Sequence, residues 1–299
     1  MSRGLGDVYK RQVFGMEDNE KIPDQIEDIK KLSKQFSTFI PYQPIMKDVA
    51  AYIFTSGTTG LPKAALVDHA KLVKGSFAGH FLCFNFNKND RLYMTLPLYH
   101  STGLILGWAA SLRSGCPNVI KSKFSASDFW NDVKKHNVNK FIYVGELCRY
   151  LMNLPPSEGD KDNPITQISG NGLRPDIWES FQKRFNINKI VEIYGATEAV
   201  GMTINSFGRS GMIGRKRSDS TIIRCNKDDG SPILNDEGFC TKVSEGETGL
   251  YIQKISSSAK FQGYLDTQAS NKKILQNVFK TGDQYFNTGD LITLHDNNW

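Results

Sequence analysis

The segment Thr55–Lys63, TSGTTGLPK, is the part of the sequence best suited to binding phosphate. Its hydroxyl side chains can donate hydrogen bonds, and its glycines allow backbone N–H groups to approach an anion closely. Lys63 adds a mobile positive charge. Such a composition is also that of a flexible linker, but the apolar run before it and the helix-like segment after it disfavour a linker. The candidate phosphate-binding residues are therefore Thr55, Ser56, Gly57, Thr58, Thr59, Gly60 and Lys63.

Two familiar nucleotide-binding motifs are excluded at this segment. A Walker A motif requires Gly-Lys five positions after its first glycine, whereas Pro62 stands at that distance from Gly57. A G-x-G-x-x-G fingerprint is also missing from the segment. We expect the segment to leave the carboxyl end of a buried parallel strand, because open α/β sheets bind ligands at that edge.

A second candidate cluster is EIYGATEAVG, residues 192–201, which follows the same strand-then-turn pattern. The Tyr194 ring could stack on a purine, and the Glu198 carboxylate could bind Mg²⁺, which prefers oxygen ligands. The alternative is that Tyr194 is a core aromatic residue and Glu198 a first-turn acid favoured by a helix dipole. The residues alone leave both interpretations open.

Two further turns carry polar side chains that suit a nucleoside. Asp290, in YFNTGDLI, could accept hydrogen bonds from both hydroxyls of a ribose. Asn171, flanked by glycines in SGNGLR, could face a flat base. Each segment is equally typical of an ordinary tight turn.

The elements that must position these residues follow a βα alternation from about residue 49 to residue 200. Apolar runs such as VAAYIFT and KIVEIYG alternate with amphipathic segments such as DHAKLVKGSFAGHFLCF. This pattern predicts an α/β fold with parallel sheets covered by helices on both faces. Beyond residue 205, glycine-punctuated β-like runs predict a smaller β-rich subdomain. We therefore divide the chain into a leader (1–48), an α/β nucleotide-binding core (49–204) and a β-rich subdomain (205–299).

Local signals mark the ends of several expected helices. Asp68 is suited to cap the start of one helix, and Ser125 with Asp128 resembles a capping box at the start of another. Gly115 stands where a third helix should end. The apolar run 102–112 is shorter than the roughly 20 residues that span a bilayer, so we expect a buried helix there.

Composition excludes several classes of protein. With 39% hydrophobic and 23% charged residues, the chain has the composition of a globular protein, not of a disordered or fibrous one. The net charge of +6 is dispersed, which argues against a nucleic-acid partner. The five cysteines lie far apart without metal-ligand spacing, which disfavours structural zinc or a disulfide framework and favours a reducing compartment. The N-terminal residues carry no secretory signal.

Taken together and in order, the motifs resemble the adenylate-forming superfamily, and within it the fatty acid transport proteins, also called very-long-chain acyl-CoA synthetases. The resemblance extends from about residue 49 to the last residue. It rests on the segments YIFTSGTTGLPKAA, LPLYHSTG, YVGELCRYLMNLPP, GNGLRPDIWESFQKRF, EIYGATE, FQGYLDTQASNKKI and VFKTGDQYFNTGDL.

The resemblance implies a fatty acid:CoA ligase that forms acyl-AMP from ATP and then a thioester with coenzyme A, with Mg²⁺ as cofactor. It implies that Lys63, Thr197 and Glu198 are catalytic, that Glu198 binds the metal, and that His100 lies near the reacting carboxylate, unless His100 only begins a helix. It implies a nucleotide site of Thr55 to Lys63, Gly170, Asn171, Gly172, Tyr194, Gly195 and Asp290. Phe77, Phe81 and Trp108 are candidates for an acyl tunnel or for plain core.

The resemblance also implies partners and a location. The full-length protein is expected to bind fatty acid, ATP and CoA at an intracellular membrane surface, of the endoplasmic reticulum, peroxisome or plasma membrane. We expect both ends to be incomplete, with the small C-terminal domain and its catalytic lysine lying beyond Trp299, and we interpret the first twelve residues as an assembly scar. One alternative is a fatty acid or nucleotide binding fragment without catalysis. Another, an enzyme of amino or aryl acids, is disfavoured by GELCRYL and GNGLR.

Overall fold

A computed structural model describes residues 43–55, 62–257 and 259–299 of the chain. The chain divides into two compact units, Met1–Ile45 and Met46–Trp299. The second unit contains all the helices and strands given below, and the fold is described for that unit alone. The candidate residues Ser56, Gly57, Thr58, Thr59 and Gly60 lie outside the described residues.

The central element of this unit is a six-stranded sheet. Five strands run parallel, and the strand at one edge, β8, runs antiparallel to its neighbour β7. In spatial order the strands are β4 (Asn118–Ile120), β3 (Leu92–Met94), β5 (Lys140–Val144), β6 (Gln167–Asn171), β7 (Lys189–Tyr194) and β8 (Thr203–Asn205). Most positions of β5, β6 and β7 are buried, as expected for strands covered on both faces.

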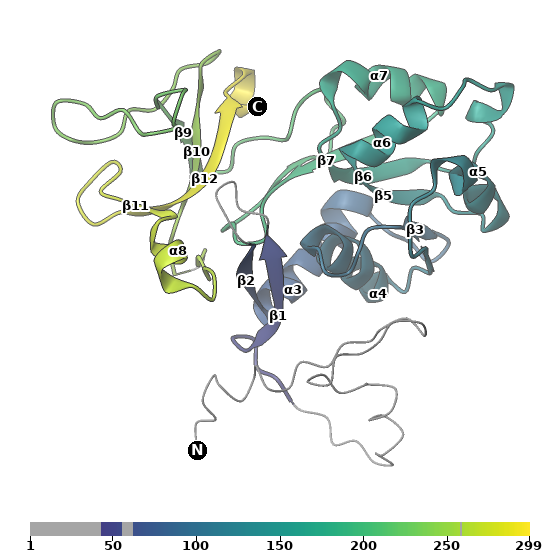
Figure 1. Cartoon of the computed structure of the whole chain (residues 1–299), viewed down its shortest axis with the longest axis horizontal. Helices are drawn as coiled ribbons and strands as arrows, with labels where there is room; N and C mark the ends of the chain where they lie inside the picture. Colours follow the sequence, from purple (N-terminus) through teal and green to yellow (C-terminus); the bar gives the residue numbers. More distant parts are fainter. Residues whose placement is uncertain (1–42, 56–61, 258) are drawn as a thin grey trace. The chain divides into compact units, whose positions relative to one another are not determined.

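Helices cover the two faces of this sheet. Figure 1 shows α6 and α7 on one side and α3 and α4 on the other. The expected boundaries are confirmed: the Asp68 side chain caps α3, Ser125 caps α5, and Gly115 ends α4 with φ +68°. The helices are α3 (His69–Phe77), η1 (Ala78–Phe84), η2 (Thr102–Ala109), α4 (Ala110–Ser114), α5 (Ala126–Lys135), α6 (Gly145–Met152), η3 (Glu158–Lys161) and α7 (Pro175–Arg184), of which η1 and η2 are π-helices.

The strand before the phosphate-binding segment differs from our expectation. β1 (Val49–Thr55) does not belong to the parallel sheet but pairs antiparallel with β2 (Lys63–Asp68). It is also not a buried strand, because Ile53 is buried while Tyr52 and Phe54 are 42% and 61% exposed. The sequence pattern predicted a helix from Asp68 onward and no element between the loop and that helix, so it missed β2, the partner that makes this a hairpin.

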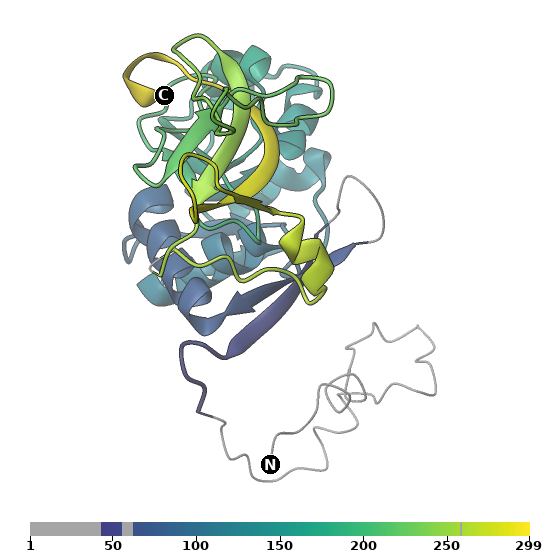
Figure 2. The same ribbon diagram turned by 90° about the vertical axis from the view of Figure 1, so that its left-hand side faces the viewer.

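The smaller β-rich part of the expected fold is confirmed, and its start at residue 205 stays a prediction. It contains a four-stranded antiparallel sheet, which Figure 2 shows in front of the helices. Ile223, Leu250 and Ile252 form part of its small core. Its elements are β9 (Ser220–Ile223), β10 (Thr248–Lys254), α8 (Thr267–Asn271), β11 (Ile274–Gln276), β12 (Gln284–Thr293) and η4 (Asp296–Asn298).

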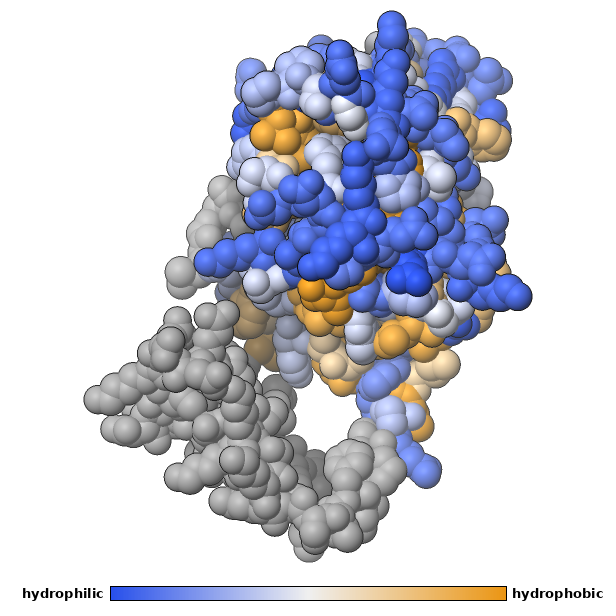
Figure 3. Space-filling model, turned by 90° about the vertical axis from the view of Figure 1, so that its right-hand side faces the viewer, coloured by the Kyte–Doolittle hydropathy of each residue, from blue (hydrophilic) through white to orange (hydrophobic). Residues whose placement is uncertain are grey.

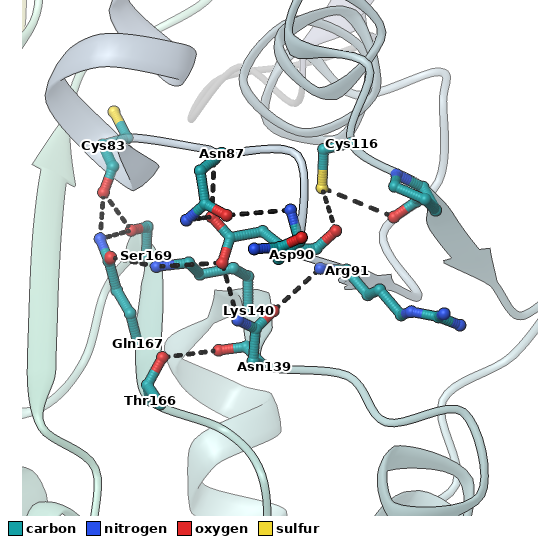
Figure 4. A network of polar contacts seen from close by, with 12 residues as sticks. Cys83, Asn87, Asp90, Arg91, Cys116, Asn139, Lys140, Thr166, Gln167 and Ser169 are labelled. Carbon is teal, nitrogen blue, oxygen red and sulfur yellow. Dashed lines mark hydrogen bonds and ion pairs between the residues drawn. The ribbon is translucent and has the colours of Figure 1, made fainter.

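A buried polar network ties the amino ends of the parallel strands together (Figure 4). Asp90, 3% exposed, accepts hydrogen bonds from the Asn87 backbone at 2.8 Å and the Asn139 side chain at 2.7 Å. The Lys140 ammonium donates to Gln167 at 3.0 Å, and burial lowers the pKa of Lys140. The network lies at the opposite strand ends from Asn171 and Tyr194. We therefore assign it a structural role, because its buried charges are paired and hydrogen-bonded.

Exposed hydrophobic side chains are spread over several elements, and one group of them lies on α3 and η1. Phe77, Phe81 and Leu82, on α3 and η1, are 44 to 55% exposed, whereas Trp108 packs against the main core. On the face drawn in Figure 3, most side chains are hydrophilic and the hydrophobic patches lie chiefly in the lower half of the view. Among the described residues, helices are too short or too polar to cross a bilayer.

Candidate nucleotide and metal site

The turn that follows β7 is held from several directions. The Thr197 hydroxyl donates to the Ser101 hydroxyl at 3.0 Å, which joins the turn to the start of η2. The Lys71 ammonium, from α3, donates to the backbone carbonyls of Thr197 and Ala199. Gln253 of β10 accepts from the backbone N–H of Val200 at 3.0 Å, so the second sheet also holds this turn. The position of Thr197 and Glu198 is therefore fixed by three separate elements.

Burial and charge compete at Lys71. Burial lowers the pKa of Lys71 to about 8, and the carboxylates of Glu198 and Asp68 act in the opposite direction. The ammonium contacts backbone carbonyls in this turn, and its charge lies near Glu198. Lys71 thus provides positive charge close to the carboxylate that we predicted as a metal ligand.

Glu198 presents one free oxygen. The residue is 8% exposed, and its Oε1 accepts a hydrogen bond from the Tyr264 hydroxyl at 2.6 Å. Within the described part of the chain, Oε2 is buried without a hydrogen-bond partner. A buried carboxylate oxygen left in this state is costly unless something binds it. The side chain therefore fits a hard cation such as Mg²⁺, which takes oxygen ligands.

A protein-only metal cage is not formed around Glu198. Among residues 43–55, 62–257 and 259–299, three or more His, Cys, Asp or Glu side chains do not gather as a metal-binding group. Mg²⁺ commonly binds through one or two carboxylates together with waters and substrate phosphates. A cation at Glu198 would need such additional oxygens.

The two described ends of the phosphate-binding segment lie beside Glu198. Thr55 pairs with Lys63 across the hairpin, and its hydroxyl donates to the Lys63 carbonyl at 3.3 Å. The Lys63 ammonium lies 5.7 Å from the centroid of the Tyr264 ring. Because the hydroxyl of the same tyrosine bonds Glu198, Lys63 and Glu198 both contact one side chain, Lys63 over the ring and Glu198 at the hydroxyl.

The predicted base and ribose residues are in direct contact. The Tyr194 hydroxyl donates to Oδ2 of Asp290 at 2.5 Å, joining the end of β7 to β12. Burial raises the pKa of Tyr194, and the hydrogen bond to Asp290 acts in the same direction. The Tyr194 ring meets Tyr251 edge-on, with centroids 5.7 Å apart. Asp290 itself is exposed and open to a ligand.

The glycine turn after β6 is held by a buried acid that the sequence interpretation missed. Glu192, 3% exposed, accepts hydrogen bonds from the Tyr143 hydroxyl at 2.5 Å and from the backbone N–H groups of Gly172 and Leu173. Burial raises the pKa of Glu192 to about 7, although these hydrogen bonds lower it. Of the expected adenine-binding residues, Gly172 is thus held by Glu192, directly after Gly170 and Asn171 at the end of β6.

Close backbone approach explains the glycines of this turn. A Cβ at Gly170 would lie 2.0 Å from the Tyr143 carbonyl oxygen, and Gly172 has φ +80°. Asn171 Oδ1 accepts from the Thr102 hydroxyl at 3.4 Å, so the turn also contacts η2. Gly195 is less restricted, since its Cβ would lie 3.2 Å from the Met202 side chain.

His100 is exposed, and its ring lies 4.6 Å from Tyr99. It immediately precedes Ser101, which contacts Thr197, so it lies along the chain next to the site. Its role near a reacting carboxylate stays a prediction.

Several residues that build the site had no recognised signal in the sequence. Ser101 lies inside LPLYHSTG and Tyr264 inside FQGYLDTQ, and neither residue is distinguished there by its type or spacing. Lys71, Glu192 and Gln253 are ordinary polar residues in a helix or strands, and only their burial distinguishes them. Their burial depends on tertiary packing, which a single sequence does not display.

The fold and a family model together give the class of protein to which the chain belongs. A crystal structure of ATP bound MatB from Rhodopseudomonas palustris superposes with a TM-score of 0.70 at 20% identity, covering 87% of this chain and 49% of that one. At that identity the likeness concerns the fold. Residues 8–264 match the AMP-binding enzyme family, and the chain belongs to it.

Curated relatives agree with the resemblance drawn from the motifs. The chain is 41% identical to long-chain fatty acid transport protein 6 of Mus musculus, covering 94% of this chain and 47% of the relative. It is 37% identical to the medium/long-chain-fatty-acid–CoA ligase FadD6 of Mycobacterium tuberculosis, covering 83% of this chain and 41% of that protein. The chain thus spans less than half the length of these two relatives.

Proposed function

We propose that the full-length protein is a long- or very-long-chain fatty acid:CoA ligase of the AMP-forming type. In the first step a fatty carboxylate oxygen bonds to the α-phosphorus of ATP, and the bond from that phosphorus to pyrophosphate breaks. In the second step the sulfur of coenzyme A bonds to the acyl carbon, and AMP leaves. The products are acyl-CoA, AMP and pyrophosphate, and acyl-CoA formation would assist fatty acid uptake.

The observation that carries this proposal is the convergence of remote segments at the ends of β6 and β7. Glu198 and Lys63 flank Tyr264, Thr197 bonds Ser101, and Tyr194 bonds Asp290. This arrangement supports a nucleotide with its phosphates near Lys63 and Glu198 and its nucleoside near Tyr194. Fixed donors and positive charge there would stabilise the negative charge that builds on departing pyrophosphate.

Mg²⁺ is part of the proposal, with Glu198 Oε2 as its protein ligand. When bound, the cation would supply positive charge beside the triphosphate. Thr197 and Lys63 would hold phosphate oxygens by hydrogen bonding and charge, and Asp290 would accept the ribose hydroxyls. We also propose that the full-length protein associates with an intracellular membrane; its likeness to the fatty acid transport proteins supports this.

The test is pyrophosphate release by the full-length protein supplied with ATP, Mg²⁺, CoA and a long-chain fatty acid. We expect release to depend on the fatty acid, with acyl-CoA as the final product. Calorimetric titration with ATP should be run in parallel. ATP binding without any pyrophosphate release would instead identify a binding protein and would end the ligase proposal.

A further inference from the structure

Tyr264 touches the candidate site at two chemically different points. Its hydroxyl donates to Glu198 at 2.6 Å, and the face of its ring lies 5.7 Å from the Lys63 ammonium. The residue is 5% exposed, so both contacts are made by a buried side chain. A phenol is neutral near pH 7, and its hydroxyl can donate only one proton. It therefore satisfies one carboxylate oxygen without neutralising the carboxylate.

The backbone holds Tyr264 against the strand that leaves the phosphate-binding segment. Tyr264 forms an antiparallel bridge with Ala65 of β2, and the Leu66 N–H donates to the Gly263 carbonyl at 3.1 Å. The Tyr264 N–H donates to the Ser270 hydroxyl at 2.8 Å, and that hydroxyl donates to the Asp266 carbonyl at 2.9 Å. Tyr264 is thus fixed relative to Lys63, which begins β2.

We propose that Tyr264 is a positioning residue that occupies Oε1 of Glu198 and so directs Oε2 toward a divalent cation beside the phosphates. The inference rests on the proposed function, because it assumes that a magnesium nucleotide is the ligand. The hydrogen bonds of the Lys71 ammonium go to the backbone carbonyls on either side of Glu198, whereas Tyr264 donates to the carboxylate itself. The ring of Tyr264 meanwhile attracts the Lys63 ammonium by a cation–π contact and holds it on the same side.

A purely structural role for the Tyr264 hydroxyl predicts something different. A buried hydrogen bond to a carboxylate stabilises the fold wherever it occurs, and loss of the bond then lowers stability without changing ligand binding. Tyr93 offers the matched case. Tyr93 is a buried residue of β3, and its hydroxyl donates to Asp132 of α5 at 2.9 Å, away from the site at the ends of β6 and β7. Tyr93→Phe removes the same kind of bond away from Glu198.

The experiment measures ATP binding by calorimetry, with and without Mg²⁺, for the full-length wild type, Tyr264→Phe and Tyr93→Phe. We expect Tyr264→Phe to bind metal-free ATP like the wild type. The ratio of ATP affinity with Mg²⁺ to that without it should fall about tenfold, the size typical of one hydrogen bond to a charged group. Tyr93→Phe should retain the full Mg²⁺ effect. An unchanged Mg²⁺ effect in Tyr264→Phe would overturn the proposal.

A second variant covers the case in which Tyr264→Phe does not fold. Ser270→Ala removes a hydrogen bond from the backbone of Tyr264 but does not alter the chemistry of the Tyr264 side chain. The side chain should then be positioned less well, so the Mg²⁺ effect on ATP affinity should fall. Full retention of that effect in Ser270→Ala would then count against the proposal. Pyrophosphate release by the wild type is measured separately, as the test of the ligase function. A wild type that binds ATP with Mg²⁺ but releases none contradicts the ligase function and leaves the role of Tyr264 standing.

Discussion

The Tyr194 hydroxyl and the Asp290 carboxylate form a 2.5 Å hydrogen bond although 96 positions separate them in the chain. Tyr194 ends a strand of the parallel sheet, and Asp290 belongs to the antiparallel sheet, so the bond joins the two halves of the unit. A residue expected to contact a base and one expected to contact a ribose are thus adjacent. That adjacency is what a single nucleoside would require.

Asp290→Ala should weaken ATP binding in the full-length protein. Loss of hydrogen bonds from a ribose diol to a carboxylate costs about 1.5–3 kcal/mol, which corresponds to a KM for ATP raised about tenfold or more. Steady-state kinetics would measure this, with Asp228→Ala as the control, because Asp228 is an exposed residue of the same subdomain. A KM for ATP that stays at the wild-type value would remove Asp290 from the ribose site.

Glu192 predicts a specific pH dependence of stability. Its pKa is raised from 4.5 to about 7 in the folded protein, mainly by burial, so folding favours the protonated side chain. The contribution of Glu192 to the free energy of unfolding is therefore fully present below pH 4.5 and is lost as the pH rises through about 7. The full change is on the order of 3 kcal/mol.

The measurement is urea unfolding of the wild type and Glu192→Gln between pH 5 and 8. The variant should lack this loss. As the pH rises, the free energy of unfolding of the wild type should therefore fall relative to that of Glu192→Gln. Glu179→Gln, an exposed change on α7, should follow the wild type across the range. Parallel curves for wild type and Glu192→Gln would show that Glu192 does not titrate in this window.

Much of the fold was predictable because its signals are local. The βα alternation, the caps at Asp68 and Ser125 and the stop at Gly115 each depend on a few neighbouring residues. β2 was missed because KAALVD is short and runs directly into α3, so the residues between the loop and the helix start at Asp68 were assigned to no element. The pairing of β1 with β2 gives the loop a hairpin geometry that strand periodicity alone does not reveal.

The site was predictable only in part, for a related reason. Thr197 and Glu198 lie in the turn after β7, and Asp290 follows a glycine within β12; the residue types of both segments are distinctive, so a sequence can point to them. Tyr264 and Lys71 act through contacts with residues more than 60 positions away, and their neighbours in the chain give no sign of this.

Gly145→Ala should disturb the glycine turn at Gly172, because Gly145 at the start of α6 packs directly against that turn. A Cβ at Gly145 would lie 1.7 Å from the Gly172 carbonyl oxygen, so the turn would have to move. Such overpacking typically costs about 1–3 kcal/mol, and ATP affinity should fall with it if the turn frames the base. Thermal unfolding and calorimetry would measure both effects. Gly159→Ala is the control, because its nearest neighbours are side-chain atoms at 3.7 and 4.0 Å. A stable variant with normal ATP affinity would argue against a base site at this turn.

Glu198→Gln should separate nucleotide binding from catalysis. The substitution keeps the shape of the side chain and its contact with Tyr264 but removes the negative charge that would hold a cation. Because charge on the leaving pyrophosphate is greatest in the transition state, we expect the rate of pyrophosphate release to fall about 100-fold or more while ATP affinity changes much less. Rapid-quench assays and calorimetry would measure the two quantities in the full-length protein. Glu237→Gln, in an exposed turn, should leave both unchanged. Equal losses of rate and affinity in Glu198→Gln would mean that this carboxylate serves ground-state binding alone, and the proposed assignment of Glu198 to catalysis would have to be withdrawn.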